Sequence, residues 1–245
     1  MKRYGLIGYP LKHSFSKKYF TNKFEAEGID NCQYELFPID KIESINDLIL
    51  KTPNLLGLNV TIPYKETIIP YLDELSEEAE EIGAVNTILL KNGKRIGYNT
   101  DVMGFRDSLF TWLPSPEGAL ILGTGGASKA IAYVLKTANI PYLKVSRSPD
   151  KGDLIYSEID EKRLRKYPLL INTTPLGTFP KVDSAPNIPY NLLSSTNSLY
   201  DLVYNPEKTV FLKRGATMSS ATKNGLEMLV AQAEYSWEIW TNIKV

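Results

Sequence analysis

The sequence predicts an α/β protein with two open, twisted-sheet domains, the second of them Rossmann-like, and a cleft between the two. Short apolar runs alternate with amphipathic helical stretches along the chain, which is typical of sheets covered by helices. An apolar run near the middle leads directly into a glycine-rich turn, as in Rossmann domains. The length of 245 residues, 43% of them hydrophobic, suits two domains of roughly 100 to 150 residues each.

The composition excludes several classes of partner. Lys and Arg total 28 and Asp and Glu total 28, so no net charge draws the chain to nucleic acid or to a membrane, and we expect a small-molecule ligand. With one cysteine, Cys32, and one histidine, His13, these residue types cannot form a disulfide or a structural metal site, and we expect no metal. Glycines and a proline interrupt the first ten residues, and no run of about 18 apolar residues follows, so we expect a cytoplasmic protein.

In the first hundred residues, three apolar runs alternate with helical patterns. The expected strands cover residues 4–8, 34–38 and 56–61, and the expected helices cover 16–27 and 44–51. Asn92-Gly93 supplies the positive φ angles of a two-residue hairpin turn between strands at 84–90 and 95–99. We expect this β-hairpin at the edge of the first domain.

Prolines and glycines at 113–118 separate a helix over about 101–110 from a new strand at 119–122, so the domain border is placed between Asp101 and Gly118. The second domain is expected to continue with a helix at 129–137 and strands at 143–146, 169–172, 198–202 and 215–218. A last helix, about 225–243, carries one apolar stripe made of Leu226, Leu229, Val230, Ala233, Trp237 and Trp240. The stripe must pack on an apolar surface, which is a core or the surface of a homodimer.

The turn after the 119–122 strand reads Gly123-Thr124-Gly125-Gly126-Ala127-Ser128 and leads into a helix. Glycines let a backbone turn sharply and approach a pyrophosphate, which amide groups and the positive end of the helix then hold. Ser128 departs from the last position of the pattern G-x-G-x-x-G/A, so an ordinary tight strand–helix turn stays open.

The next strand ends at Ser146-Arg147-Ser148, about 20 residues further on, where an NAD-binding domain places a carboxylate. Arg147 can instead bond a 2′-phosphate through two parallel hydrogen bonds and stack on the adenine. This favours NADP over NAD and predicts a Rossmann-like NADP-binding domain. A solvated surface arginine is the alternative interpretation.

Polar residues of the first domain gather at expected strand ends, where open α/β sheets collect ligand groups. Ser14 and Ser16 precede a helix, so they cap it or hold a ligand carboxylate. Asn59 and Thr61 alternate with apolar neighbours and share one face of their strand. Asn86 and the segment Asn99-Thr100-Asp101 form a further polar group around the expected hairpin.

Lys65, Asp101 and His13 are the candidates for acid–base chemistry. Hydride transfer at a carbon that bears oxygen requires a proton to move on that oxygen, and a lysine can both donate and accept it. Lys65 follows a strand end and Asp101 follows the hairpin. The spacing leaves open whether the two side chains meet.

Taken together, these segments resemble the shikimate dehydrogenase family along almost the whole chain. The family's motifs occur in order as GLIGYPLKHSFS, NVTIPYK, GAVNTI, GYNTDVMGF, LGTGGASKA, INTTPLGT, DLVYNP and NGLEMLVAQA. The resemblance implies reversible, NADPH-dependent reduction of 3-dehydroshikimate to shikimate in aromatic amino acid biosynthesis. It also implies a substrate-binding catalytic domain of residues 1–101 plus 226–245, and an NADP-binding domain of residues 102–225.

The resemblance assigns roles to individual residues. Lys65 would be the proton donor and acceptor, and Asp101 would bind the substrate and keep Lys65 in place. Ser14 and Ser16 would hold the substrate carboxylate, and the remaining substrate contacts would be Asn59, Thr61, Asn86, Tyr204 and Gln232. The cofactor would contact Gly123, Thr124, Gly125, Gly126 and Ala127 at the pyrophosphate, Ser146 and Arg147 at the 2′-phosphate, and Thr173, Leu202 and Gly225 at the nicotinamide.

The chain departs from the family pattern in the second domain, and other functions stay open. Ser146-Arg147-Ser148 replaces Asn-Arg-Thr, Thr178 replaces a usual methionine, and the chain is shorter around 151–165. A quinate/shikimate dehydrogenase with broader substrate and cofactor use is one alternative, although Arg147 disfavours NAD. A non-catalytic nucleotide or metabolite sensor is the other, although such a sensor has no use for Lys65 and Asp101.

Overall fold

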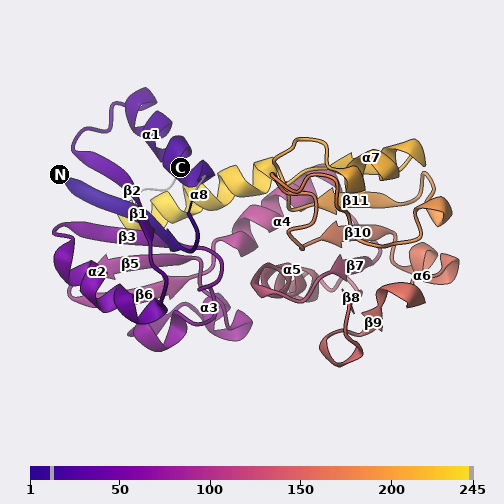
Figure 1. Ribbon diagram of the computed structural model, residues 1–245, viewed down its shortest axis with the longest axis horizontal. Coiled ribbons are helices and arrows are strands. Elements are labelled where there is room, and N and C mark those ends of the chain that lie inside the picture. Colours follow the sequence, from indigo (N-terminus) through magenta and orange to yellow (C-terminus); the bar gives the residue numbers. More distant parts are fainter. Residues whose placement is uncertain (12–13, 243–245) are drawn as a thin grey trace. The chain divides into compact units, whose positions relative to one another are not determined.

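The computed structural model describes residues 1–11 and 14–242 (Figure 1). The chain divides into two compact units: unit 1 comprises Met1–Thr100 and Ala233–Val245, and unit 2 comprises Asp101–Gln232. Each unit contains one six-stranded sheet with helices packed on it and its own buried apolar clusters. The predicted α/β class with two sheet domains is confirmed, and each unit is described by itself.

The sheet of unit 1 is mixed. Its strand order is β2-β1-β3-β5-β6-β4, with the bounds β1 Lys2–Gly8, β2 Cys32–Pro38, β3 Leu55–Val60, β4 Glu74–Leu75, β5 Thr87–Lys91 and β6 Lys94–Tyr98. Strand β1 runs parallel to β2 and β3, whereas β5 is antiparallel to β3 and β6. The β5–β6 pair is the predicted hairpin, with φ of 54° at Asn92 and 76° at Gly93. The edge beyond it is the two-residue β4, which is too short to leave a sequence pattern.

Serine side chains cap two of the helices of unit 1. The helices of this unit are α1 Phe15–Ala26, η1 Ile42–Ser44, α2 Ile45–Lys51, η2 Ile69–Tyr71, α3 Glu77–Ile82 and the later part of α8 Leu226–Thr241. The Ser14 hydroxyl accepts the Lys17 N–H at 3.4 Å and so caps α1. Helix α3, which the sequence analysis missed, is capped by Ser76 and ends at Gly83 with φ of 67°.

The later part of α8 is buried against β1 and α1 through aromatic contacts. Trp237 and Trp240 pack on Tyr4 with ring centroids 5.3 and 5.0 Å apart. A Cβ at Gly57 would lie 2.2 Å from the Trp240 indole nitrogen, so only glycine fits beneath that ring. The predicted apolar stripe is confirmed for Ala233 and both tryptophans, but Leu226, the first residue of α8, is 42% exposed. The prediction that the helix continues to residue 243 lies outside the described residues.

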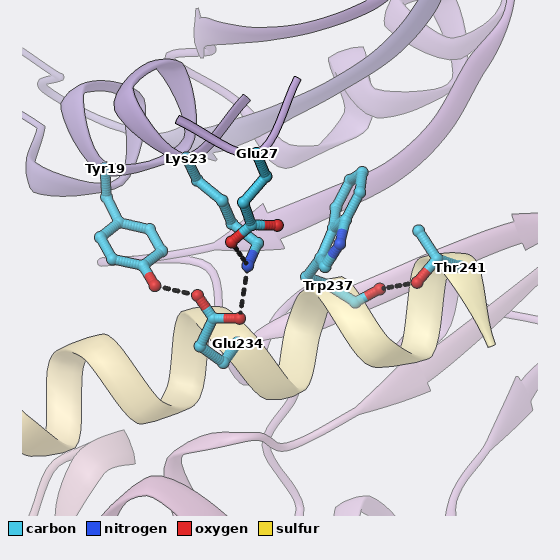
Figure 2. A network of polar contacts seen from close by, with 6 residues as sticks. All are labelled: Tyr19, Lys23, Glu27, Glu234, Trp237 and Thr241. Atoms are coloured by element: carbon cyan, nitrogen blue, oxygen red, sulfur yellow. Dashed lines mark hydrogen bonds and ion pairs between the residues drawn. The ribbon is translucent and has the colours of Figure 1, made fainter. Parts of the chain in front are cut away.

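A partly buried ion-pair network joins α1 to α8 within unit 1 (Figure 2). The Lys23 ammonium donates to Glu27 at 2.7 Å and to Glu234 at 2.8 Å, and the Tyr19 hydroxyl donates to the other Glu234 oxygen. Burial alone would lower the pKa of Lys23, but its hydrogen bonds to the two carboxylates outweigh burial and raise it. The charged network therefore fixes α1, the helix that Ser14 caps.

The sheet of unit 2 is entirely parallel, as the strands of a Rossmann-like fold require. Its order is β12-β11-β10-β7-β8-β9, with the bounds β7 Ala119–Leu122, β8 Tyr142–Ser146, β9 Leu154–Ile155, β10 Leu169–Asn172, β11 Ser198–Asp201 and β12 Ala221–Lys223. From β7 the chain builds outward to β9, then returns to the other side of β7 and builds outward to β12. The strand order therefore reverses between β7 and β10, where open α/β sheets bind ligands.

Helices cover the parallel sheet of unit 2. They are α4 Asp101–Trp112, α5 Gly126–Thr137, η3 Pro149–Lys151, η4 Tyr156–Glu158, α6 Glu161–Lys166, η5 Tyr190–Leu192, α7 Val210–Thr217 and the first part of α8. Helices α4 and α5 lie side by side, and α5 packs on β7 and β8 (Figure 1). Among the described residues, no helix is both long and apolar enough to cross a lipid bilayer.

The strand predicted at 215–218 is wrong, because these residues belong to α7 and to the turn that follows it. The Thr209 hydroxyl accepts the Leu212 N–H and caps α7, and Phe211, Leu212 and Gly215 lie on the buried side at helical spacing. A Cβ at Gly215 would approach Leu199 to 2.4 Å, so the glycine serves helix–sheet packing. The actual edge strand, β12, has three residues and no apolar run.

Candidate functional site

The loop after β3 carries Lys65 and is pinned by backbone hydrogen bonds within unit 1. The Thr61 N–H donates to Ile7 O at 2.9 Å, and the Tyr64 N–H donates back to Thr61 O at 2.9 Å. The Lys65 carbonyl accepts the Val85 N–H at 2.7 Å. This bond places the backbone of Lys65 beside the segment that carries Asn86, and Lys65 itself is half-buried.

Asn59 lies on β3 in a buried polar cluster and is 4% exposed. Its Oδ1 accepts from the Tyr34 hydroxyl at 2.8 Å, and its Nδ2 donates to Ser236 Oγ at 2.9 Å and to Thr87 Oγ1 at 3.2 Å. Burial raises the pKa of Tyr34, and a hydrogen bond from the Ser16 hydroxyl opposes that shift. The predicted residues Ser16 and Asn59 therefore meet through Tyr34.

Asn86 precedes β5 and is 2% exposed. Its Oδ1 accepts the Thr100 N–H at 2.7 Å and the Thr87 hydroxyl at 3.1 Å. The Val60 N–H donates to the Asn86 carbonyl at 2.8 Å, which ties Asn86 to the end of β3. Within unit 1 the structure thus brings together Ser16, Asn59, Asn86 and the backbone of Lys65, as a ligand site requires.

Three predicted substrate residues belong to unit 2. Asp101 begins α4 directly after Thr100, and Gln232 is 7% exposed with its Nε2 donating to Leu229 O at 2.9 Å. A Cβ at Gly104 would lie 2.6 Å from Met228 O, so glycine permits the close crossing of α4 and α8. Burial raises the pKa of Tyr204, which keeps its hydroxyl protonated as a hydrogen-bond donor.

The glycine turn stands at the reversal of strand order in unit 2. Gly123 follows β7 with φ of 118°, and a Cβ there would meet Thr173 Oγ1, at the end of β10, at 2.7 Å. Gly125, the N-cap of α5, has no such constraint. Its φ is −83°, which other residues adopt, and no neighbouring atom lies within 4 Å of a Cβ built there. The fold therefore does not need glycine at 125, whereas a pyrophosphate approaching the start of α5 would need it.

The remaining predicted cofactor residues line the ends of neighbouring strands. Ser146 is buried at the end of β8, and its hydroxyl accepts the Ser148 N–H at 3.1 Å, so the exposed Arg147 sits on an ordered turn. A Cβ at Gly225 would meet Leu202 O at 2.2 Å, which shows that these two predicted residues pack directly against each other. These residue types fit NADP, because glycines precede and begin a helix and an exposed arginine follows the neighbouring strand.

A buried carboxylate that was not predicted from the sequence holds the ends of β10 and β11 together by hydrogen bonds. Asp201, 0% exposed at the end of β11, accepts hydrogen bonds from Asn172 Nδ2 at 2.9 Å, Val203 N at 3.0 Å and Thr209 Oγ1 at 2.6 Å. Burial raises the pKa of Asp201 to about 6, and the three hydrogen bonds oppose that rise. Its only sequence signal was its place inside the motif DLVYNP.

Three hydroxyls of unit 1 were also assigned no role from the sequence: Thr87, Thr100 and Ser236, each 0% exposed. Ser236 had a signal, because it continues the helical spacing of Leu229, Ala233 and Trp240 on α8. A serine at a core position must hydrogen-bond to a buried partner. The predicted candidate His13 lies outside the described residues.

These features place the protein in the class of two-domain α/β oxidoreductases that use a dinucleotide cofactor. Comparisons with known proteins specify the family. Residues 6–88 match the shikimate dehydrogenase substrate binding domain, and residues 225–245 match the shikimate 5′-dehydrogenase C-terminal domain. The chain belongs to the shikimate dehydrogenase family.

Relatives resemble the chain along its full length. The shikimate dehydrogenase (NADP(+)) of Clostridium beijerinckii is 43% identical over 98% of this chain and 92% of its own. The crystal structure of shikimate dehydrogenase 1 from Peptoclostridium difficile is 39% identical, with a TM-score of 0.85 over 100% of this chain and 93% of its own. The Thermus thermophilus enzyme, solved with NADP(H) and shikimate, is 31% identical, with a TM-score of 0.87 over 100% and 95% of the two chains.

Proposed function

We propose that the protein is an NADP-dependent shikimate dehydrogenase, which reversibly reduces 3-dehydroshikimate to shikimate in aromatic amino acid biosynthesis. The observation that carries this proposal is the anchored Lys65. Its carbonyl accepts the Val85 N–H at 2.7 Å, so the backbone of an acid–base residue is held beside the segment that carries the buried Asn86 and Thr87. Membership of the shikimate dehydrogenase family indicates the substrate, a ring acid that carries hydroxyl groups. The polar side chains near Lys65 suit such a substrate.

Unit 1 provides most of the groups that would bind shikimate. The hydroxyls of Ser14 and Ser16, at the start of the 12-residue helix α1, suit the carboxylate because helix starts favour negative charge. The neutral side chains of Asn59, Thr61 and Asn86 suit the ring hydroxyls, which donate and accept hydrogen bonds. Tyr204 and Gln232 would complete the set with further neutral groups.

Lys65 and Asp101 would carry the proton transfer. NADPH, when bound, supplies the hydride. The Lys65 ammonium polarises the ketone of 3-dehydroshikimate and protonates the oxygen that becomes the hydroxyl; in the reverse direction its amine accepts that proton. The Asp101 carboxylate, at the start of α4, would accept a hydrogen bond from the substrate.

Unit 2 would hold NADP. The start of α5, with Gly123, Thr124, Gly125, Gly126 and Ala127, receives the pyrophosphate, and Ser146 with Arg147 receives the 2′-phosphate. Thr173, Leu202 and Gly225 would face the nicotinamide. All the residues proposed for NADP belong to unit 2, whereas most of those proposed for shikimate belong to unit 1.

Location and assembly are two further points. We place the protein in the cytoplasm, where Cys32, the single cysteine, stays reduced. The apolar stripe of the last helix could have formed a homodimer surface. Its tryptophans, Trp237 and Trp240, are only 6% and 7% exposed within one chain, so this stripe supports no homodimer proposal.

The test is absorbance of the reduced nicotinamide with purified protein and shikimate, comparing NADP with NAD, and then quinate with shikimate. Faster turnover with shikimate and NADP supports the proposal. Equal turnover with NAD or quinate indicates the broader quinate/shikimate dehydrogenase. Binding of NADP without any turnover contradicts catalysis and indicates a sensor.

A further inference from the structure

Three buried hydroxyls form a closed triad beneath the proposed substrate site of unit 1. Thr87 Oγ1 lies 2.9 Å from Ser236 Oγ and 3.2 Å from Thr100 Oγ1, and Ser236 Oγ lies 3.2 Å from Thr100 Oγ1. All three residues are 0% exposed, and they come from β5, from the residue before α4, and from α8. Each hydroxyl can donate one hydrogen bond and accept others, so the triad can transmit an orientation from one neighbour to the next.

The two ends of the triad fix the direction of its hydrogen bonds. At one end, Asn59 Nδ2 only donates, and it lies 2.9 Å from Ser236 Oγ. At the other end, Asn86 Oδ1 only accepts, and it lies 3.1 Å from Thr87 Oγ1 and 3.2 Å from Thr100 Oγ1. The protons therefore point from Asn59 through Ser236 to the threonines and on to Asn86.

Backbone groups prevent either amide from turning over. The Thr100 N–H can only donate, and it lies 2.7 Å from Asn86 Oδ1, so the Nδ2 of Asn86 must lie on the opposite side. The Asn86 carbonyl can only accept, and it lies 3.4 Å from Asn59 Nδ2, so Asn59 Oδ1 faces the Tyr34 hydroxyl. Each amide thus has one orientation, and the hydroxyls of Ser236 and Thr87, which both accept from Asn59 Nδ2, link the two amides.

We propose that Ser236 is a positioning residue for substrate binding: through the hydroxyl triad it holds the amides of Asn59 and Asn86 in the orientation that meets the ring hydroxyls of the substrate. This inference rests on the proposed function. Ser236 itself is fully buried and acts through the two amides. Shikimate recognition then depends on a side chain of α8 that lies beneath the site.

The main test is Ser236→Ala, which removes the middle hydroxyl and changes little else. We expect KM for shikimate to rise about five- to tenfold, because Asn59 loses the shortest of the three hydrogen bonds that its Nδ2 donates, at 2.9 Å, and its amide is held less firmly. KM for NADP should stay within about twofold, since the triad lies in unit 1. A matched control is Ser108→Ala in unit 2, which removes another buried serine hydroxyl, 2.8 Å from the Tyr200 hydroxyl. This control should leave KM for shikimate unchanged.

A second pair of variants keeps the proposal testable if Ser236→Ala does not fold. Thr87→Val removes a triad hydroxyl without changing side-chain shape, and Thr87→Ser retains the hydroxyl. The valine variant should raise KM for shikimate as Ser236→Ala does, and the serine variant should restore it.

Three outcomes are distinguishable. If the wild-type protein does not turn over shikimate, the proposed function fails. If the wild type is active but Ser236→Ala and Thr87→Val leave KM for shikimate unchanged, this inference fails alone. Parallel rises in KM for shikimate and NADP would show a merely structural role and would also overturn the inference.

Discussion

The two units bury their polar groups in different ways. Unit 1 buries a cluster of uncharged side chains, Asn59, Asn86, Thr87, Thr100 and Ser236, which satisfy one another. Unit 2 buries the carboxylate of Asp201 among three donors, and presents glycine backbone at the end of its sheet. The neutral cluster of unit 1 fixes the orientation of side chains, whereas the glycines of the turn in unit 2 have no side chains and leave the backbone accessible to a ligand.

This contrast matches the ligands that we propose for each unit. The hydroxyl groups of a ring both donate and accept hydrogen bonds. Amides with a fixed orientation present a donor at one place and an acceptor at another, so they distinguish a ring with correctly placed hydroxyls from other rings. Phosphates accept only, so backbone N–H groups, a helix start and an arginine bind them. We infer that substrate specificity depends on side-chain orientation in unit 1, and cofactor affinity on backbone approach in unit 2.

The largest effect is expected from Lys65, the residue of unit 1 that we propose for acid–base catalysis. Lys65→Ala should lower kcat about a thousandfold, because loss of a general acid–base group typically costs about 10² to 10⁴ in rate. KM for shikimate should change little. Steady-state kinetics measure both, with the exposed Lys91→Ala of the same unit as control. Near-normal turnover of Lys65→Ala would remove this residue from the mechanism.

The buried charge of unit 2 predicts an unusual pH dependence of stability. The pKa of Asp201 is raised from 3.8 to about 6, so the unfolded chain loses this proton first as the pH rises. The Asp201 contribution to the free energy of unfolding should therefore fall by ~3 kcal/mol between about pH 3 and pH 7, and Asp201→Asn should abolish that slope. Urea unfolding of both proteins across this range measures it. Parallel pH profiles would contradict the raised pKa.

A substitution of Arg147 tests whether its guanidinium group accounts for the preference for NADP over NAD. Arg147→Ala should raise KM for NADP about 10- to 100-fold, the value of a lost charged hydrogen-bond pair, and leave KM for NAD nearly unchanged. Arg165→Ala is a suitable control, because that side chain is 78% exposed and pairs with Glu161. An equal effect on both cofactors would place Arg147 away from the 2′-phosphate.

Substitutions of Gly125 and Gly123 distinguish an effect on NADP affinity from an effect on the stability of the fold. Gly125→Ala should weaken NADP binding about tenfold while the melting temperature stays unchanged, because a methyl group there meets no protein atom within 4 Å. Gly123→Ala should lower both the affinity and the melting temperature, since φ is 118° and Thr173 Oγ1 is 2.7 Å from the new Cβ. Calorimetry and thermal unfolding distinguish the two. Unchanged NADP affinity of Gly125→Ala would contradict the proposed pyrophosphate site.

Most of the fold could be predicted from the sequence because its signals are local. The hairpin followed from Asn92-Gly93, and the parallel core strands followed from short apolar runs. The wrong strand at 215–218 shows the limit: Gly215 and its apolar neighbours suit a short buried strand as well as the end of α7, and packing against Leu199 decides between them. The three-residue β12 and the two-residue β4 exist only through pairing with β11 and β6.

The candidate site could be predicted only in part, since a motif shows which residues are polar but not which of them meet. The sequence pointed to Asn59, Asn86 and Lys65. It did not show that Ser236, about 150 residues after Asn86, links the two amides. That contact depends on α8 packing beside β3 and β5, which is a property of the tertiary structure.

The most direct test of the division between the units is calorimetric titration of Ser236→Ala and Gly125→Ala, each with shikimate alone and with NADP+ alone. We expect Ser236→Ala to weaken shikimate binding about five- to tenfold with NADP+ affinity within about twofold of wild type, and Gly125→Ala to weaken NADP+ about tenfold with shikimate unchanged. If either variant weakened both ligands equally, the two units would not divide substrate and cofactor recognition in this way.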